Sequence, residues 1–168
     1  MGKHVLAAVL AVLFMASGAQ AAGNVWNDSF NKAKKTLEWQ GYYDHRITLY
    51  CGAAFDEKKD VALPEGFTAP KHEKRAGKIE WEHVVPAENF GRAFPEWREG
   101  DAQCVDKRGK AFRGRKCAER VNREYRLMQS DMYNLYPAIG AVNALTAAEL
   151  ALAGVENVIP CDEVIDAM

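Results

Sequence analysis

Apolar residues recur at helical intervals near the start of the chain. Between residues 24 and 39 they are Trp26, Phe30, Ala33 and Leu37. This spacing is that of one face of an α-helix. Asn27 or Asp28 can cap the beginning of the helix, and Gly41 is expected to end it.

The second half of the chain predicts two helices separated by a short strand. Residues 117–132 carry apolar side chains on one helical face, and residues 134–136 (Asn-Leu-Tyr) form a short apolar run. Pro137 suits the first turn of the next helix, where its missing N–H costs nothing. That helix is predicted from residue 138 to about residue 153, and Gly154 stops it.

Two runs in the middle of the chain predict strands. One covers residues 46–50 (Arg-Ile-Thr-Leu-Tyr), and the other covers residues 79–85 and is ended by Pro86. Residues 56–78 are polar and are predicted to be mostly loop, while residues 86–94 are predicted to form a short helix or turn. With no internal repeat, the pattern predicts an α+β domain, mainly helical, with short strands.

Residues 1–21 are typical of a secretory signal peptide. A short basic start leads into an apolar run over residues 5–15, and Ala-Gln-Ala at residues 19–21 fits a cleavage site. The run is too short to span a bilayer, although an N-terminal membrane anchor is the alternative. We expect residues 22–168 to form a single exported domain, periplasmic or secreted, with no membrane contact after cleavage.

Export to an oxidising compartment makes disulfide bonds the expected state of the cysteines. The chain has four, too widely spaced for a zinc knuckle: Cys51, Cys104, Cys117 and Cys161. We favour a bond between Cys104 and Cys117, which bracket a charged, glycine-containing loop with little else to order it. Cys51 would then pair with Cys161, and free buried thiols are the alternative.

The distribution of charge indicates a phosphate-containing partner, although the net charge of −1 does not. Nine Lys and Arg residues lie between residues 107 and 126, opposed by only two Glu residues. A second basic cluster over residues 71–78 precedes the predicted strand. Phosphate binding needs a local positive field rather than a net positive charge. A solvated charged surface is the alternative.

The strongest chemical signal is a carboxylate beside an imidazole, Glu82 and His83, at the end of a predicted strand. Successive strand side chains point to opposite faces, so the pair can serve one site only where the backbone bends. A carboxylate oxygen binds a hard cation, and a neutral imidazole open to solvent accepts a proton from water. A hydrolytic metal site is therefore predicted, with an incidental histidine as the alternative. Glu80 is interpreted as a surface or salt-bridging carboxylate facing away from Glu82.

A second candidate ligand lies on the predicted helix after the short strand. Asn143 is nine positions beyond Asn134 and can direct its side-chain carbonyl towards the end of the first strand. An amide oxygen and a carboxylate oxygen together suit Mg²⁺, with Ca²⁺ or Mn²⁺ as alternatives. The predicted strands at residues 79–85 and 134–136 and this helix would form a ββα unit, with the polar residues close together between them.

Several strings along the chain carry a family resemblance. They are Ile-Glu-Trp-Glu-His-Val-Val-Pro-Ala at 79–87, Phe-Gly at 90–91, Tyr-Arg-Leu-Met at 125–128, Asp-Met-Tyr-Asn-Leu at 131–135, Pro-Ala-Ile-Gly at 137–140 and Val-Asn at 142–143. With these strings the sequence resembles the endonuclease I family, which comprises periplasmic and secreted non-specific nucleases. That family belongs to the ββα-metal (His-Me finger, HNH-like) superfamily.

The resemblance implies a role for each candidate residue. Glu82 and Asn143 would hold the metal ion, and His83 would be the general base. Arg115, one residue closer to Cys117 than the family pattern suggests, would contact the phosphate. Asn134 would tie the two strands together and orient the loop that carries His83.

The implied function is that of a Mg²⁺-dependent endonuclease, monomeric, acting on double- or single-stranded DNA and on RNA. It would leave 5′-phosphate products and show no sequence preference. Beyond Asn143 the sequence departs from the family, with an alanine-rich segment at residues 144–148. We therefore expect the C-terminal part of the family fold to be missing. The alternative function is a catalytically impaired remnant that binds nucleic acid through its basic loop.

Overall fold

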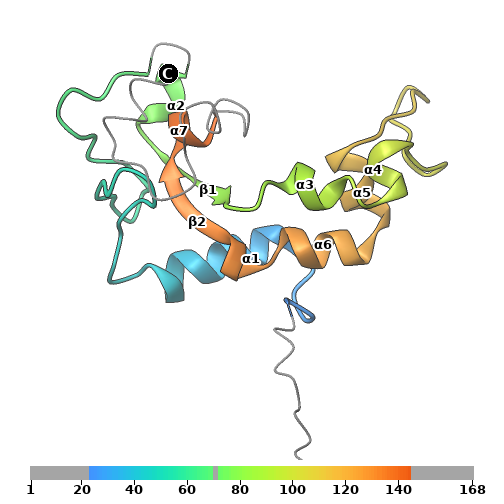
Figure 1. Ribbon diagram of the computed structural model, residues 1–168, viewed down its shortest axis with the longest axis horizontal. Helices are drawn as coiled ribbons and strands as arrows, with labels where there is room; N and C mark the ends of the chain where they lie inside the picture. The colour runs from blue at the N-terminus through green and yellow to red at the C-terminus, as the bar shows by residue number, and fades with distance from the viewer. Residues whose placement is uncertain (1–22, 70–71, 145–168) are drawn as a thin grey trace, which may run out of the picture.

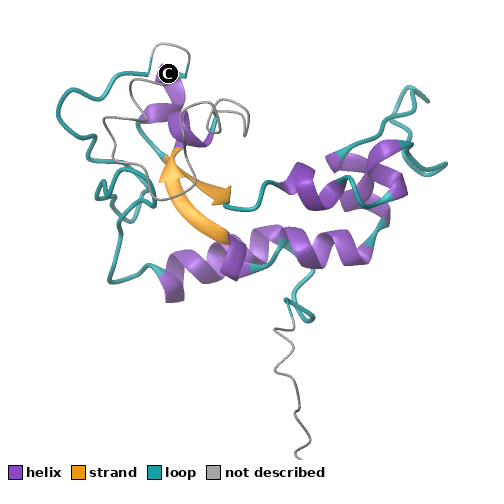
Figure 2. Cartoon of the chain, in the orientation of Figure 1, coloured by secondary structure: helices purple, strands orange, loops and turns teal. Residues whose placement is uncertain are grey.

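The computed structural model describes residues 23–69 and 72–144. Its elements, in chain order, are α1 (Phe30–Thr36), the π-helical η1 (Leu37–Gly41), α2 (Glu73–Ala76), β1 (Ile79–His83), α3 (Ala87–Gly91), α4 (Pro95–Arg98), α5 (Arg115–Val121), α6 (Arg123–Gln129), the 3₁₀-helical η2 (Met132–Asn134), β2 (Leu135–Ile139) and α7 (Gly140–Asn143). This mixture of helices and one small sheet confirms the predicted α+β class (Figure 2). The predicted signal peptide and the helix beyond residue 144 lie outside the described residues.

The two strands form an antiparallel pair at the centre of the molecule. Ile79 lies opposite Ile139, and His83 lies opposite Leu135. Figure 1 shows α2 and α7 together at one end of the pair, while α3, α4 and α5 gather beyond the other end. Alternate residues of β1 are buried, as expected for a strand with one face against a core. Within the described residues, no helix has the length and apolar character needed to cross a membrane.

The continuous helix formed by α1 and η1 covers the buried face of the sheet. Ala33 and Leu37 pack in one cluster with Ile79, Trp81 and Leu135. The prediction that Gly41 ends this helix is confirmed, but the predicted start was too early. Ser29 is the N-cap, because its side chain accepts a hydrogen bond from the Lys32 backbone N–H.

Pro137 lies in β2, so the prediction that it opens a helix was wrong. The Gly140 N–H donates to the Lys78 carbonyl (2.8 Å), which makes this a hydrogen-bonded pair of the ladder. Such pairs alternate with pairs that share no hydrogen bond, and Pro137, opposite Trp81, falls on one of the latter. Its carbonyl accepts from the Leu49 N–H (2.8 Å), so the strand tolerates proline at no loss of pairing.

Two other predicted elements were also wrong in detail. Residues 46–50 form no strand, and only an isolated bridge joins Ile47 to Ala54. The helix predicted over residues 117–132 is two helices, α5 and α6, divided at Asn122. Asn122 has extended backbone (φ −108°, ψ 113°) and caps α6, accepting a hydrogen bond from the Tyr125 N–H. Its capping ability outweighs the apolar periodicity that continues through it.

The predicted disulfide between Cys104 and Cys117 is confirmed, with their Cα atoms 5.4 Å apart. Both cysteines are fully buried, and the bond closes the charged loop that precedes α5. Cys51 is also disulfide-bonded. Its predicted partner, Cys161, lies outside the described residues.

Candidate active site

Four of the predicted site residues line a single cavity of about 660 Å³: Glu82, His83, Arg115 and Asn143. They come from β1, from the first residue of α5 and from the last residue of α7. The fold therefore gathers at one place residues that are up to sixty positions apart in the chain. Asn134 does not line the cavity, and its side chain bonds instead to the backbone of Val85.

The acidic residues of the cavity differ in their partners. Glu38 pairs with Lys59 (2.7 Å), Glu80 with Arg75 and Glu88 with Arg92. Glu82 has no ion pair among the described residues. Burial raises the pKa of the Glu82 carboxyl to about 7, and nearby Glu80 adds to the rise, although Arg115 and Arg75 oppose it. A half-buried carboxylate that no ion pair neutralises is suited to bind a cation.

Glu80 lies on the same face of β1 as Glu82, so the prediction that it faces away was wrong. Residues i and i+2 of a strand share a face, and that alternation could have placed it correctly. The Asn143 side-chain amide donates to Glu80 Oε2 (2.8 Å), which leaves its carbonyl oxygen for another partner. Although burial alone would raise the pKa of Glu80, hydrogen bonds from Arg75 and Asn143 hold it below its usual value.

Gly140 lets α7 approach the cavity closely. A Cβ atom at this position would lie 2.6 Å from the Arg75 carbonyl oxygen and 2.9 Å from Glu80 Oε1. No side chain fits in that space, so only glycine allows the turn from β2 into α7 here. The helix then carries Asn143 to Glu80 and into the lining of the cavity.

His83 is held by a backbone carbonyl and two aromatic rings. Its Nε2 lies 2.9 Å from the Gln129 carbonyl oxygen, which can only accept, so the neutral ring carries its proton there. Nδ1 is then the basic nitrogen. The ring stacks on Phe30, with centroids 5.2 Å apart, and also contacts Phe90. Burial lowers the pKa of His83 and Arg115 lowers it further, while the Gln129 hydrogen bond opposes the shift, so the imidazole is neutral at pH 7.

The sequence predicted an imidazole open to solvent, whereas the structure leaves His83 only 6% exposed. The residue nevertheless lines the cavity, through which a substrate can approach the ring. Phe30 was predicted as part of a helix face, and its contact with His83 was missed. The periodicity identified its orientation correctly but not the ring it would meet.

Asn134 joins the segment after β1 to the segment before β2. Its side chain accepts a hydrogen bond from the Val85 N–H (2.7 Å) and donates to the Val85 carbonyl (3.0 Å). Its own carbonyl accepts from the Val84 N–H (3.1 Å). Three hydrogen bonds from one residue thus fix the chain directly after His83.

Arg115 begins α5, two residues before the disulfide-bonded Cys117. Gly114 precedes it with a φ of 77°, a left-handed conformation that favours glycine and turns the loop into the helix. The Arg115 side chain lines the cavity and acts electrostatically on Glu82 and His83. Among the described residues no carboxylate pairs with it.

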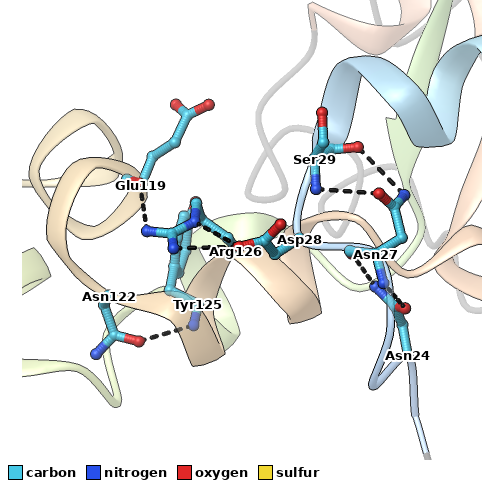
Figure 3. A network of polar contacts seen from close by, with 8 residues as sticks. All are labelled: Asn24, Asn27, Asp28, Ser29, Glu119, Asn122, Tyr125 and Arg126. Carbon is cyan, nitrogen blue, oxygen red and sulfur yellow. Dashed lines mark hydrogen bonds and ion pairs between the residues drawn. The ribbon is translucent and has the colours of Figure 1, made fainter.

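The start of α1 is anchored to α6 by polar contacts that span about one hundred residues of sequence (Figure 3). The Arg126 guanidinium donates two hydrogen bonds to Asp28 Oδ2 (3.3 and 3.2 Å). The Asn24 amide donates to the Leu127 carbonyl (2.9 Å). Since the Gln129 carbonyl at the end of α6 also holds His83, this helix positions both the imidazole and the segment that brings Phe30 onto it.

The sequence matches the family described as Endonuclease I over residues 23–149. It is 38% identical to an "Extracellular deoxyribonuclease" of Aeromonas hydrophila over 119 residues, which cover 68% of this chain and 46% of that protein. It is also 38% identical to a "Periplasmic deoxyribonuclease" of the same organism over 107 residues, covering 61% of this chain and 39% of that protein. The chain thus spans about half the length of the curated relatives it matches, or less.

A short stretch is similar to a protein with a different name. Over 31 residues the chain is 68% identical to the "Probable L-serine dehydratase, alpha chain" of Bacillus subtilis (strain 168). The stretch covers 18% of this chain and 10% of that protein. It is too small a part of either chain to indicate a shared function.

Proposed function

The chain belongs to the endonuclease I family, and we propose that it is a metal-dependent endonuclease that hydrolyses phosphodiester bonds of DNA. The observation that carries this proposal is the convergence of four groups on one cavity. They are an amide, a neutral imidazole, and a carboxylate and a guanidinium that form no ion pair with any residue of the described part of the chain. Each supplies one requirement of phosphodiester hydrolysis.

The donor set fits a divalent cation. Glu82 is a half-buried carboxylate with no ion pair among the described residues, and the carbonyl oxygen of Asn143 is left over from the hydrogen bond to Glu80. Oxygen ligands of this kind suit Mg²⁺, which we propose as the metal, and Ca²⁺ or Mn²⁺ would bind the same atoms. When bound, the cation would stabilise negative charge on the phosphoryl group and on the leaving oxygen.

His83 is proposed to be the general base. With its proton held on Nε2 by the Gln129 carbonyl, the lone pair of Nδ1 can accept a proton from the attacking water. The Phe30 and Phe90 rings limit rotation of the imidazole, so its basic nitrogen keeps one orientation. Glu82, the residue before His83 and on the opposite face of the strand, also lines this cavity.

Arg115 is proposed to bind a non-bridging oxygen of the scissile phosphate. A guanidinium offers a planar, permanently charged donor fork that matches phosphate. Contacts to the sugar-phosphate backbone of a nucleic acid do not distinguish between bases, so we expect cleavage of DNA and RNA without sequence preference. Departure of the 3′-oxygen would leave 5′-phosphate ends.

The names of the relatives support an extracytoplasmic location. One is described as extracellular and another as periplasmic. The buried disulfide between Cys104 and Cys117 is typical of an oxidising compartment. We propose that this chain, too, acts in the periplasm or outside the cell, and that it acts as a monomer.

A plasmid-nicking assay tests the proposal. Supercoiled plasmid is incubated with the full chain in Mg²⁺ or in EDTA, beside the variants His83→Ala and His45→Ala. Nicking that requires Mg²⁺, is lost in His83→Ala and persists in His45→Ala is the expected result. His45 is the matched control because it is exposed and does not line the cavity. A gel shift without nicking under any condition would favour the nucleic-acid-binding remnant instead.

A further inference from the structure

The positively charged side chains of the cavity fall into two groups. Lys59 pairs with Glu38, and Arg75 pairs with Glu80, so these two charges are neutralised within the protein. Arg115 and Lys34 also line the cavity, but neither forms an ion pair with any described residue. Unpaired cations in a cavity are the groups left to bind an anionic ligand. Arg115 already has a proposed role, whereas Lys34 has none.

Lys34 lies on the face of α1–η1 that borders the cavity. Phe30, Lys34 and Glu38 are four residues apart, so they occupy the same side of the helix. The Lys34 ammonium sits over the Phe30 ring, with Nζ 4.5 Å from its centroid, and that ring stacks on His83. The aromatic face partly compensates the charge, but it leaves the N–H donors of the ammonium available to a further ligand.

Lys34 lies close enough to the proposed general base for both residues to act on one nucleic-acid strand. Nζ lies 4.5 Å from the Phe30 centroid, which is 5.2 Å from the imidazole centroid. The ammonium is therefore within about 10 Å of the imidazole centroid, a span of no more than about three nucleotides at a rise of about 3.4 Å each. The α1 segment is also anchored before substrate binds, because Asp28 pairs with Arg126 of α6 (Figure 3) and Asn24 donates to the Leu127 carbonyl.

We infer that Lys34 forms a second phosphate site, which binds a backbone phosphate of the nucleic acid about one to three nucleotides from the scissile one. This inference rests on the proposed nuclease function and adds to it a contact on the side of the cavity formed by α1. Lys34 and Arg115 would then hold the backbone at two points, and His83 would face the bond to be broken.

The test measures how salt affects DNA binding. A fluorescent 20-base-pair duplex is titrated with the full chain in EDTA at several KCl concentrations, using wild type, Lys34→Gln, Lys34→Arg and Lys35→Gln. Losing one phosphate contact lowers the slope of log K against log[KCl] by about 0.9, which corresponds to about eightfold weaker binding at 0.1 M KCl. Lys35 is the matched control, because it is the next residue, is exposed and does not line the cavity.

The expected result is a reduced slope in Lys34→Gln alone, with Lys34→Arg and Lys35→Gln close to wild type. In the nicking assay Lys34→Gln should raise KM by a similar factor and leave kcat within about twofold. Equal slopes for Lys34→Gln and Lys35→Gln would overturn the inference. A wild-type chain that binds duplex but does not nick it would refute the nuclease proposal and still leave the slopes to decide on Lys34. Absence of any binding would refute both.

Discussion

Replacing both Cys104 and Cys117 by alanine should lower the stability of the protein and its affinity for the substrate. The bond joins residues thirteen positions apart. Closing a loop of that length removes chain entropy from the unfolded state worth about 3 kcal/mol. Both cysteines are fully buried, so losing their sulfur atoms adds about 1 kcal/mol through weaker packing.

For a domain of this size, such a loss corresponds to a fall in the thermal midpoint of about 10 °C. Circular dichroism on the double variant measures this fall. Reduction by dithiothreitol is not equivalent, because Cys51 is disulfide-bonded as well. A midpoint that drops by less than about 2 °C would refute the loop-closure reasoning.

The same variant should also affect the proposed phosphate contact. Arg115 lies two residues before Cys117, at the end of the loop that the bond closes. Without the bond the first turn of α5 can move, so KM for plasmid DNA should rise, though less than in Arg115→Ala. An unchanged KM, measured well below the thermal midpoint, would show that Arg115 is positioned by Gly114 and the helix alone.

Three further outcomes follow from the site. Asn134→Ala removes two hydrogen bonds to the Val85 backbone and should cost about 1–3 kcal/mol of unfolding free energy in urea titration; a change within error would contradict the role given to these bonds. Asp28→Asn and Arg126→Gln each break a partly exposed ion pair, so each should lower the free energy of unfolding by less than about 1 kcal/mol. Each should also lower kcat, and a double-mutant cycle on kcat should show that the two residues are coupled. Glu82→Gln should abolish heat release on titration with Mg²⁺ in calorimetry, and persisting binding would place the metal elsewhere.

Local features of the fold were predictable where a single residue decides them. Gly41 ended the first helix as predicted, and the loop bounded by Cys104 and Cys117 closed as predicted. Predictions failed where a local preference met a tertiary partner. Judged from the sequence alone, Pro137 fits the start of a helix. In the structure it lies opposite Trp81 of β1, at a position of the β-ladder where no backbone N–H is needed. At Asn122 the conflict was instead between two local signals, because its capping of α6 ends a helix that the apolar pattern alone would continue.

The chemistry of the candidate site was partly visible in the sequence and partly not. The adjacency of Glu82 and His83 pointed to a strand that lines the cavity, and strand periodicity alone would have put Glu80 on the same face as Glu82. The burial of His83 was not predictable from its neighbours in sequence. It depends on Phe30, more than fifty residues earlier, and on a carbonyl of Gln129, which lies beyond the disulfide loop.

Ion pairs between side chains in the cavity explain why the overall charge of the chain does not indicate a phosphate-binding site. Glu38 and Lys59 neutralise each other across 21 residues of sequence, whereas Arg75 and Glu80 are five residues apart and Glu88 and Arg92 four, and a charge count alone identifies none of these pairs. Among the cavity residues, and counting only ion pairs within residues 23–69 and 72–144, the groups without a partner are one carboxylate, Glu82, and two cations, Lys34 and Arg115. A metal ion would offset the first and substrate phosphates the others, so the protein needs no excess of basic residues to bind nucleic acid. Its net charge of −1 is therefore compatible with a nuclease, because the field that matters is set by the few charges that folding leaves unpaired.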